Sequence, residues 1–137
     1  MIFMCNGMGR SGSTYQYNLA RLFARLTGSS DARGFIAPES EAHTVSITDE
    51  QIVEWANSDS YEVLKMHSVH PMLPELLEAG LVRVLYIYRD VRDVAVSLKR
   101  VWNMRGERLV KRVDNHVRAY NTLFKLREAF PQNFLWQ

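Results

Sequence analysis

The sequence is poor in cysteine and has no long apolar segment. Cys5 is the single cysteine among 137 residues, so no internal disulfide can form, and a reducing compartment is expected. No apolar run approaches the roughly 20 residues that a membrane-spanning helix requires. The N-terminus also lacks the basic and apolar stretches of a secretory signal. These absences favour a cytoplasmic protein without a membrane segment.

Charges of the two signs nearly balance, but they are unevenly distributed. The segment Arg83–Arg118 contains ten Lys and Arg residues against four Asp and Glu, a local net charge of +6. Since the totals are 17 and 15, the rest of the chain has seven basic and eleven acidic residues, a net charge of −4. A basic block favours an anionic ligand, although a solvated helix face would give the same pattern.

The order of expected elements predicts the class of fold. A length of 137 residues suits one domain. Strand patterns alternate with helix patterns, which predicts a three-layer α/β/α domain with a central parallel sheet. The expected strands are Ile2–Asn6, Tyr61–Met66, Leu81–Tyr88 and Phe134–Trp136. The expected helices are Tyr15–Leu26, Thr48–Asn57, Pro71–Ala79, Asp90–Val101 and Glu107–Phe130.

Three local patterns support this order. Leu19, Leu22, Phe23 and Leu26 have the spacing of an amphipathic helix. Gln51 lies three residues after Thr48, as in a capping box. The segment Gly34–Ser46, which includes a proline, is expected to be irregular. The last strand has only begun where the sequence ends, so we expect a domain whose C-terminal part is missing.

A glycine-rich loop lies between the first strand and the first helix. Such a loop directs backbone N–H groups and a helix N-terminus toward one point, an arrangement that binds phosphate or sulfate. Gly7 and Gly12 allow the backbone to come close to the anion, and hydroxyl groups come from Ser11, Ser13 and Thr14. Many glycine-rich turns are only turns, but the position after the first strand favours an anion site.

The loop shares its glycine spacing with nucleoside triphosphatases, G-x-x-x-x-G-K-[ST], but differs in its charge. Ser13 stands where the lysine is required, and the positive charge is at Arg10 instead. An ATPase also needs a carboxylate at the end of a later strand to help hold Mg²⁺, whereas Arg89 ends the strand here and Asp90 follows it. These differences favour an anion held by protein charges, with no metal.

The tyrosine-phosphatase loop is a second alternative. That loop needs five residues between its cysteine and its arginine, and only four separate Cys5 from Arg10. Cys5 also falls in an expected strand, where a buried and inert thiol is the more common case. This alternative is rejected.

Lys65 and His67 are candidates for catalysis. They stand two apart at the carboxyl end of an expected strand, so their side chains share one face, at the end where parallel sheets form ligand sites. A histidine can take a proton from an alcohol or phenol, and an ammonium group can stabilise a transferring anion. A surface lysine and a helix-capping histidine are the alternative. His43 and His116 belong to no motif and are expected at the surface.

Arg89 and Ser97 form a second candidate pair. Arg89 ends the most apolar strand, and Ser97 lies about two turns into the next helix. Arginine can bind phosphate through two parallel hydrogen bonds. A polar pair on a helix surface is the alternative interpretation.

Three segments resemble sulfotransferases that use 3′-phosphoadenosine 5′-phosphosulfate (PAPS), and most closely the cytosolic type. Gly7-Met-Gly-Arg-Ser-Gly-Ser-Thr-Tyr15 resembles the 5′-phosphosulfate loop of that family. Lys65-Met-His67 resembles the segment with the catalytic histidine, and Tyr88-Arg-Asp-Val-Arg-Asp-Val-Ala-Val-Ser97 resembles the 3′-phosphate signature. The three occur in the family's order, which implies a P-loop NTPase-like sulfotransferase fold.

The resemblance implies a role for each of these residues. His67 would be the general base, Lys65 would neutralise the transferring sulfonate, and Arg10 would contact the 5′-phosphosulfate. The loop contacts would come from Ser11, Gly12, Ser13 and Thr14. Tyr15 would stack on adenine, and the 3′-phosphate would be bound by Arg89 and Ser97.

The implied activity is sulfonate transfer from PAPS to a hydroxyl or amine of a small-molecule or glycan acceptor, with no metal and no nucleic-acid partner. The family's C-terminal basic, glycine-containing loop has no counterpart in the sequence. Two alternatives therefore stay open, which are a nucleotide-binding fragment without turnover and a P-loop small-molecule kinase. The acceptor pocket is expected from Gly34–Ser46, from the loop around Trp102–Gly106 and from the missing part.

Overall fold

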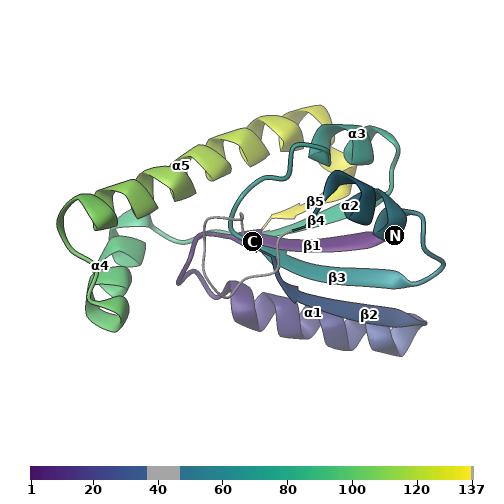
Figure 1. Ribbon diagram of the computed structural model, residues 1–137, viewed down its shortest axis with the longest axis horizontal. Coiled ribbons are helices and arrows are strands. Elements are labelled where there is room, and N and C mark those ends of the chain that lie inside the picture. Colours follow the sequence, from purple (N-terminus) through teal and green to yellow (C-terminus); the bar gives the residue numbers. More distant parts are fainter. Residues whose placement is uncertain (37–46, 137) are drawn as a thin grey trace.

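The computed structural model describes residues 1–36 and 47–136 and has a five-stranded, entirely parallel sheet at its centre (Figure 1). The strands are arranged in the order β2-β3-β1-β4-β5. Their bounds are β1 Ile2–Gly7, β2 Ser30–Phe35, β3 Tyr61–Met66, β4 Val82–Ile87 and β5 Phe134–Trp136.

Helices cover both faces of this sheet. One face packs against α1, and α2, α3 and α5 lie over the other (Figure 1). The bounds are α1 Ser13–Thr27, α2 Asp49–Ala56, α3 Leu73–Glu78, α4 Val91–Trp102 and α5 Gly106–Ala129, with a short 3₁₀ helix at Pro131–Asn133. The predicted α/β/α fold with a parallel sheet is confirmed. No helix within the described residues is long and apolar enough to span a membrane.

Alternation along the strands produces two separate cores. Successive side chains of a strand point to opposite faces, so Met4 and Leu64 join the cluster with α2, α3 and α5. Cys5 and Val63, one residue away in each strand, pack instead against Tyr17 and other residues of α1. A strand buried on both faces needs apolar residues at nearly every position, which is why β1, β3 and β4 were recognisable in the sequence.

Strand β2 was not predicted. The expectation of an irregular segment from position 34 is wrong for Gly34 and Phe35, which belong to β2, while 37–46 lie outside the described residues. This strand lies at the edge of the sheet, and none of its side chains is fully buried. Its sequence therefore has no apolar pattern. The register shifts between Ala32 and Gly34, which has a positive φ of 78°.

Helix α1 is where it was predicted, but it uses another face for the core. Its buried residues are Ser13, Gln16, Tyr17 and Ala24. The apolar stripe at Leu19, Leu22, Phe23 and Leu26 is between 48% and 78% exposed. The stripe borders an open apolar cavity that also involves Phe3, Leu85 and Leu135. Apolar spacing therefore predicted the helix correctly, without identifying the side that faces the core.

The capping box at the start of α2 is confirmed. The backbone N–H of Gln51 donates to Thr48 Oγ1 at 3.2 Å, and the Thr48 N–H donates to Gln51 Oε1 at 3.1 Å. Two N–H groups of the first turn thus find partners within four residues. Local hydrogen bonding of this kind is readable from sequence.

Candidate functional site

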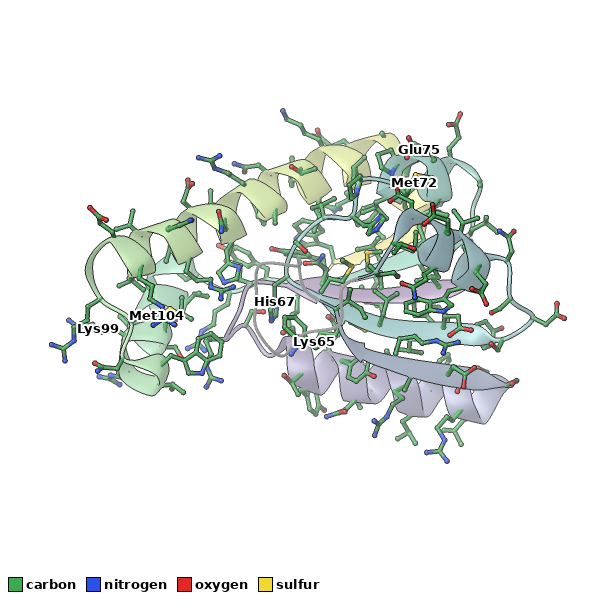
Figure 2. All side chains as sticks on the ribbon, viewed as in Figure 1. Lys65, His67, Met72, Glu75, Lys99 and Met104 are labelled. Atoms are coloured by element: carbon green, nitrogen blue, oxygen red, sulfur yellow. The ribbon has the colours of Figure 1, made fainter. Side chains whose placement is uncertain are left out.

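The candidate residues meet at the carboxyl ends of three adjacent strands. The glycine-rich loop follows β1, His67 follows β3 and Arg89 follows β4. Because these strands are parallel and neighbours in the sheet, their carboxyl ends lie at one edge. In Figure 2, Lys65 lies near the start of α1, and His67 lies between Lys65 and α5. The topology thus collects segments that are far apart in sequence.

The loop between β1 and α1 is a tight turn that leaves a helix N-terminus open. The Ser11 N–H and the Ser11 hydroxyl both donate to the Met8 carbonyl, at 3.1 and 2.6 Å. Arg10 and Gly12 have positive φ values of 69° and 98°. Helix α1 has no side-chain cap and no acidic residue in its first turn. Its first N–H groups have no intrahelical acceptor, so this end of α1 favours an anion.

Gly7 is required by a close approach between β1 and β4. A Cβ at this position would lie 2.7 Å from Ile87 Cγ2 and 2.8 Å from the Ile87 carbonyl oxygen. The Gly7 N–H is bonded to Asn6 Oδ1 at 2.7 Å, which fixes the start of the loop. The absence of a side chain therefore sets where the loop begins.

Lys65 places a positive charge at the start of α1. Its ammonium group donates to Thr14 Oγ1 at 2.8 Å and lies 5.3 Å from the centre of the Phe35 ring. Burial lowers the pKa of Lys65, and the charge of Arg10 lowers it further. The Lys65 ammonium group and the Thr14 hydroxyl therefore lie together at the start of α1, although the two residues are 51 positions apart in sequence.

Arg10, Arg89 and Ser97 form a second cluster. Arg10 Nε donates to Ser97 Oγ at 3.2 Å, and Arg89 Nη1 donates to the Arg10 carbonyl at 3.1 Å. The Arg10 guanidinium also lies 5.9 Å from the centre of the Trp102 ring. Arg89 is within 3.7 Å of Asp93, a pair exposed to solvent. The side chain of Arg10 thus lies with the pair that the resemblance assigns to the 3′-phosphate.

The other predicted loop residues differ in their exposure. Ser13 is buried at the first position of α1, and Ser11 is buried with its hydroxyl bonded inside the loop. Tyr15 is 69% exposed, so its ring is accessible to a flat ligand.

His67 is oriented by the loop. Its Nδ1 lies 2.6 Å from the Gly7 carbonyl oxygen. A carbonyl only accepts, so Nδ1 carries the proton and Nε2 is left as the acceptor. Burial lowers the pKa of His67 to about 4. The hydrogen bond to Gly7 raises this pKa, whereas the charges of Lys65 and Arg112 lower it. The imidazole is therefore neutral at pH 7 and able to take a proton.

His116 was expected at the surface, and this expectation is wrong. The residue is buried, and the Gly9 N–H of the loop donates to its Nε2 at 3.3 Å. The rings of His116 and His67 are 5.9 Å apart, with their planes at 80°. His116 lies in the middle of a long, mostly polar helix and in no motif, so no sequence signal identified it. Only the packing of α5 over the loop brings it to the site.

The remaining histidines have other positions. His70 is buried near the start of α3, where its Nδ1 accepts from the Met72 N–H at 3.2 Å and its Nε2 lies 3.7 Å from Asp49. It therefore has structural partners of its own. His43 lies outside the described residues.

A cavity of about 320 Å³ adjoins His67. Phe35, His67 and the two residues after it line one side, and α5 lines the other with residues such as Arg112, His116 and Thr122. Phe35 belongs to the segment Gly34–Ser46 that was expected at the acceptor pocket, while 37–46 lie outside the described residues. The described residues from 102 to 106 do not line this cavity.

Cys5 and Asp90 bear on the tyrosine-phosphatase and ATPase alternatives. Burial raises the pKa of the Cys5 thiol to about 12, so it is not a nucleophile at neutral pH. Asp90 accepts from the Arg92 backbone at 2.8 Å and from its guanidinium at 2.7 Å, and these bonds lower its pKa to about 2. The carboxylate after β4 therefore caps α4 and pairs with an arginine.

The parallel sheet, with basic residues around an open helix N-terminus, defines an α/β protein whose loop favours an anion. Comparison with protein families gives the class directly. Residues 4–135 match the family described as "Sulfotransferase domain", and the chain belongs to that family. Searches of curated proteins and of solved structures gave no match. Membership supports sulfonate transfer as the general activity.

Proposed function

We propose that this chain transfers a sulfonate group from PAPS to a hydroxyl or amine of an acceptor, with His67 as the general base. The observation that carries the proposal is the juxtaposition of three groups at one sheet edge. A neutral histidine, an ammonium group and an open helix N-terminus are connected there by the contacts of Gly7 with His67 and of Thr14 with Lys65. This combination would provide both a base and a site for the anion.

The nucleotide would be held by two clusters. The loop from Ser11 to Thr14, with the N-terminus of α1, would bind the 5′-phosphosulfate, and Tyr15 would stack on adenine. Arg89 and Ser97 both contact Arg10 and would bind the 3′-phosphate, while Arg10 would contact the 5′-phosphosulfate. When bound, PAPS supplies an activated sulfonate group. No metal-dependent step is part of the proposal.

The chain's own residues account for the proton and the charge. His67 Nε2 takes the proton of the acceptor hydroxyl, and Gly7 keeps the ring in the required tautomer. The acceptor oxygen forms a bond to sulfur, while the bond between sulfur and the 5′-phosphate oxygen breaks. The electron pair of the broken bond goes to the phosphate. Lys65 neutralises the negative charge that moves across the sulfonate.

A small-molecule kinase is the weaker candidate. Ser13 occupies the position of the P-loop lysine, and the carboxylate after β4 is paired with Arg92. A fragment that binds the nucleotide without turnover would use the same nucleotide-binding loop and would differ from the proposed enzyme only in lacking catalysis. A small-molecule or glycan acceptor and a cytoplasmic location stay predictions.

Transfer of labelled sulfonate from PAPS to a panel of phenols, alcohols and amines tests catalysis. The wild type should turn over, and His67→Ala should reduce turnover by at least a hundredfold while 3′,5′-ADP still binds. Turnover of His67→Ala at the wild-type rate would exclude His67 as the base. Binding without turnover in the wild type would favour the fragment. Stabilisation by Mg²⁺–ATP, with none by 3′,5′-ADP, would favour the kinase.

The 3′-phosphate assignment has its own test. Arg89→Ala should weaken binding of 3′,5′-ADP by about tenfold or more and leave binding of 5′-AMP, which lacks the 3′-phosphate, nearly unchanged. Arg92→Ala is the matched control, because this exposed arginine lies three residues away and pairs with Asp90. If Arg89→Ala affects both nucleotides equally, Arg89 does not read the 3′-phosphate.

A further inference from the structure

His116 lies inside the site, yet the proposed function gives it no role. It comes from the middle of α5, is 3% exposed and lines the cavity beside His67. The rings of the two histidines are 5.9 Å apart, with their planes at 80°. Burial of a polar ring is costly unless the ring is hydrogen-bonded, so the contacts of His116 indicate what it does there.

The hydrogen bond of His116 fixes one peptide group of the glycine-rich loop. The Gly9 N–H donates to His116 Nε2 at 3.3 Å, and this N–H belongs to the peptide group between Met8 and Gly9. The carbonyl of the same group, that of Met8, accepts from the Ser11 N–H and the Ser11 hydroxyl. Because a peptide group is planar and trans, its N–H and C=O point in opposite directions. His116 therefore also orients the carbonyl that closes the turn.

The preceding peptide group carries the contact that orients the base. The Gly7 carbonyl, in the peptide group between Gly7 and Met8, lies 2.6 Å from His67 Nδ1. Two consecutive peptide groups of the loop are thus bonded to the two histidines, one to each. The two groups are joined at the Cα atom of Met8, so a rotation of one is transmitted to the other. The orientation of His67 therefore depends on what holds Gly9.

Apolar packing alone does not provide this orientation. Met8 packs in an apolar cluster with Val94 and Leu98 of α4, which restrains where the loop lies. Hydrophobic contacts are not directional, whereas a hydrogen bond depends on its angle. The fit is also close, since a Cβ at Gly9 would lie 3.0 Å from His116 Nε2. His116 thus adds direction to a loop that packing has already placed.

We propose that His116 is a positioning residue of the site, which holds the Met8–Gly9 peptide group and thereby orients both the anion-binding turn and the imidazole of His67. This inference rests on the proposed function, in which the turn binds the 5′-phosphosulfate and His67 takes the proton. The geometry that supports it is the series of contacts from α5 through two peptide groups to the base. Because His116 Nε2 accepts from Gly9, this nitrogen is not the base.

His116→Ala and His116→Gln test the inference, with His70→Ala as the matched control. His116→Ala removes the acceptor of the Gly9 N–H, whereas in His116→Gln the side-chain carbonyl can accept this bond. His70 is similarly buried, at 6% exposure, but it bonds to Met72 and lies near Asp49, and neither belongs to the loop. Urea unfolding of the three variants shows how much of any effect is a loss of stability.

The first measurement is the tautomer of His67, by proton–nitrogen NMR correlation of the imidazole. His116→Ala should give a mixture of the two tautomers, because the Gly7 carbonyl is no longer held in place. The second is kcat for transfer of labelled sulfonate, which should fall by about ten- to a hundredfold in His116→Ala. His116→Gln and His70→Ala should keep the wild-type tautomer and a kcat within about threefold of the wild type, because the loop contacts remain.

The outcomes separate this inference from the proposed function. If the wild type transfers sulfonate, a wild-type tautomer or an unchanged kcat in His116→Ala would overturn the inference and leave the function intact. An equal loss of kcat in His70→Ala would also overturn it, because His116 would then only support folding. If the wild type shows no transfer, a tautomer that changes in His116→Ala and persists in His116→Gln would support the positioning role while contradicting the function. Should His116→Ala not fold, His116→Phe, which keeps a ring but has no acceptor, takes its place in each comparison.

Discussion

Replacing Gly7 by alanine should destabilise the protein and disturb the site at the same time. The added Cβ would lie 2.7 Å from Ile87 Cγ2, 2.8 Å from the Ile87 carbonyl and 2.9 Å from Ser11 Oγ. Ile87 is the partner of Gly7 in the β1–β4 ladder, so its carbonyl cannot move without opening that ladder. The conflict is steric, because Gly7 is not among the residues with positive φ.

The net cost follows from opposing contributions. Overpacking of a well-packed position costs about 1–3 kcal/mol. Two contributions offset part of this cost. The new methyl group adds apolar contact, and alanine makes the unfolded chain less flexible, which stabilises the folded state by about 0.4–1 kcal/mol. We therefore expect the free energy of unfolding to fall by about 1–2 kcal/mol. The Gly7 carbonyl that orients His67 would move as well, so sulfonate transfer should fall by more than stability explains.

Urea unfolding followed by circular dichroism measures the stability, and transfer of labelled sulfonate from PAPS, together with titration of 3′,5′-ADP, measures the effect on the site. Gly28→Ala is the matched control, since its new Cβ would meet only Tyr61 at 3.5 Å and its φ of 169° is extended. That variant should change stability by less than about 0.5 kcal/mol. Equal stability and equal nucleotide affinity of the two variants would refute the proposed role of the close approach at Gly7.

Three further predictions concern buried polar groups. Arg33→Ala leaves Glu62, 1% exposed and bonded to Arg33 at 2.7 Å, without its partner and should cost about 3 kcal/mol in urea unfolding at pH 7. Burial raises the pKa of Glu62, but bonds from Arg33 and two serines lower it overall. The cost should therefore shrink as Glu62 is protonated at acid pH, and a constant cost would contradict the ion pair. The neutral His67, with a pKa of about 4, binds fewer protons than the unfolded chain between that value and about 6.5. Stability should thus fall as the pH falls through this window, and His67→Gln should show about 3 kcal/mol less of this loss; equal slopes would argue against a buried neutral imidazole. His116→Ala should reduce stability by about 2 kcal/mol in the same assay, because the residue is buried against Gly9, whereas a change below 0.5 kcal/mol would match a surface residue.

The sequence determined the elements whose causes are local. Strands buried on both faces carry nearly continuous apolar runs, so β1, β3 and β4 could be found, and the Thr48 capping box closes within four residues. The glycine loop and the Lys65–His67 pair could be selected because their chemistry depends on residue type and short spacing. Parallel strands then imply that their carboxyl ends meet, which was enough to predict that these segments share a site.

Packing decided what the sequence could not show. The face of α1 that is buried depends on which strands it covers, and its exposed stripe at Leu22 and Phe23 contradicts a simple amphipathic reading. Edge strand β2 has no apolar signal because it is only partly covered. His116 and Arg112 reach the site because α5 crosses over the loop. Contacts between residues about 100 positions apart, such as Gly9 with His116, arise from tertiary packing, and no local pattern in the sequence encodes them.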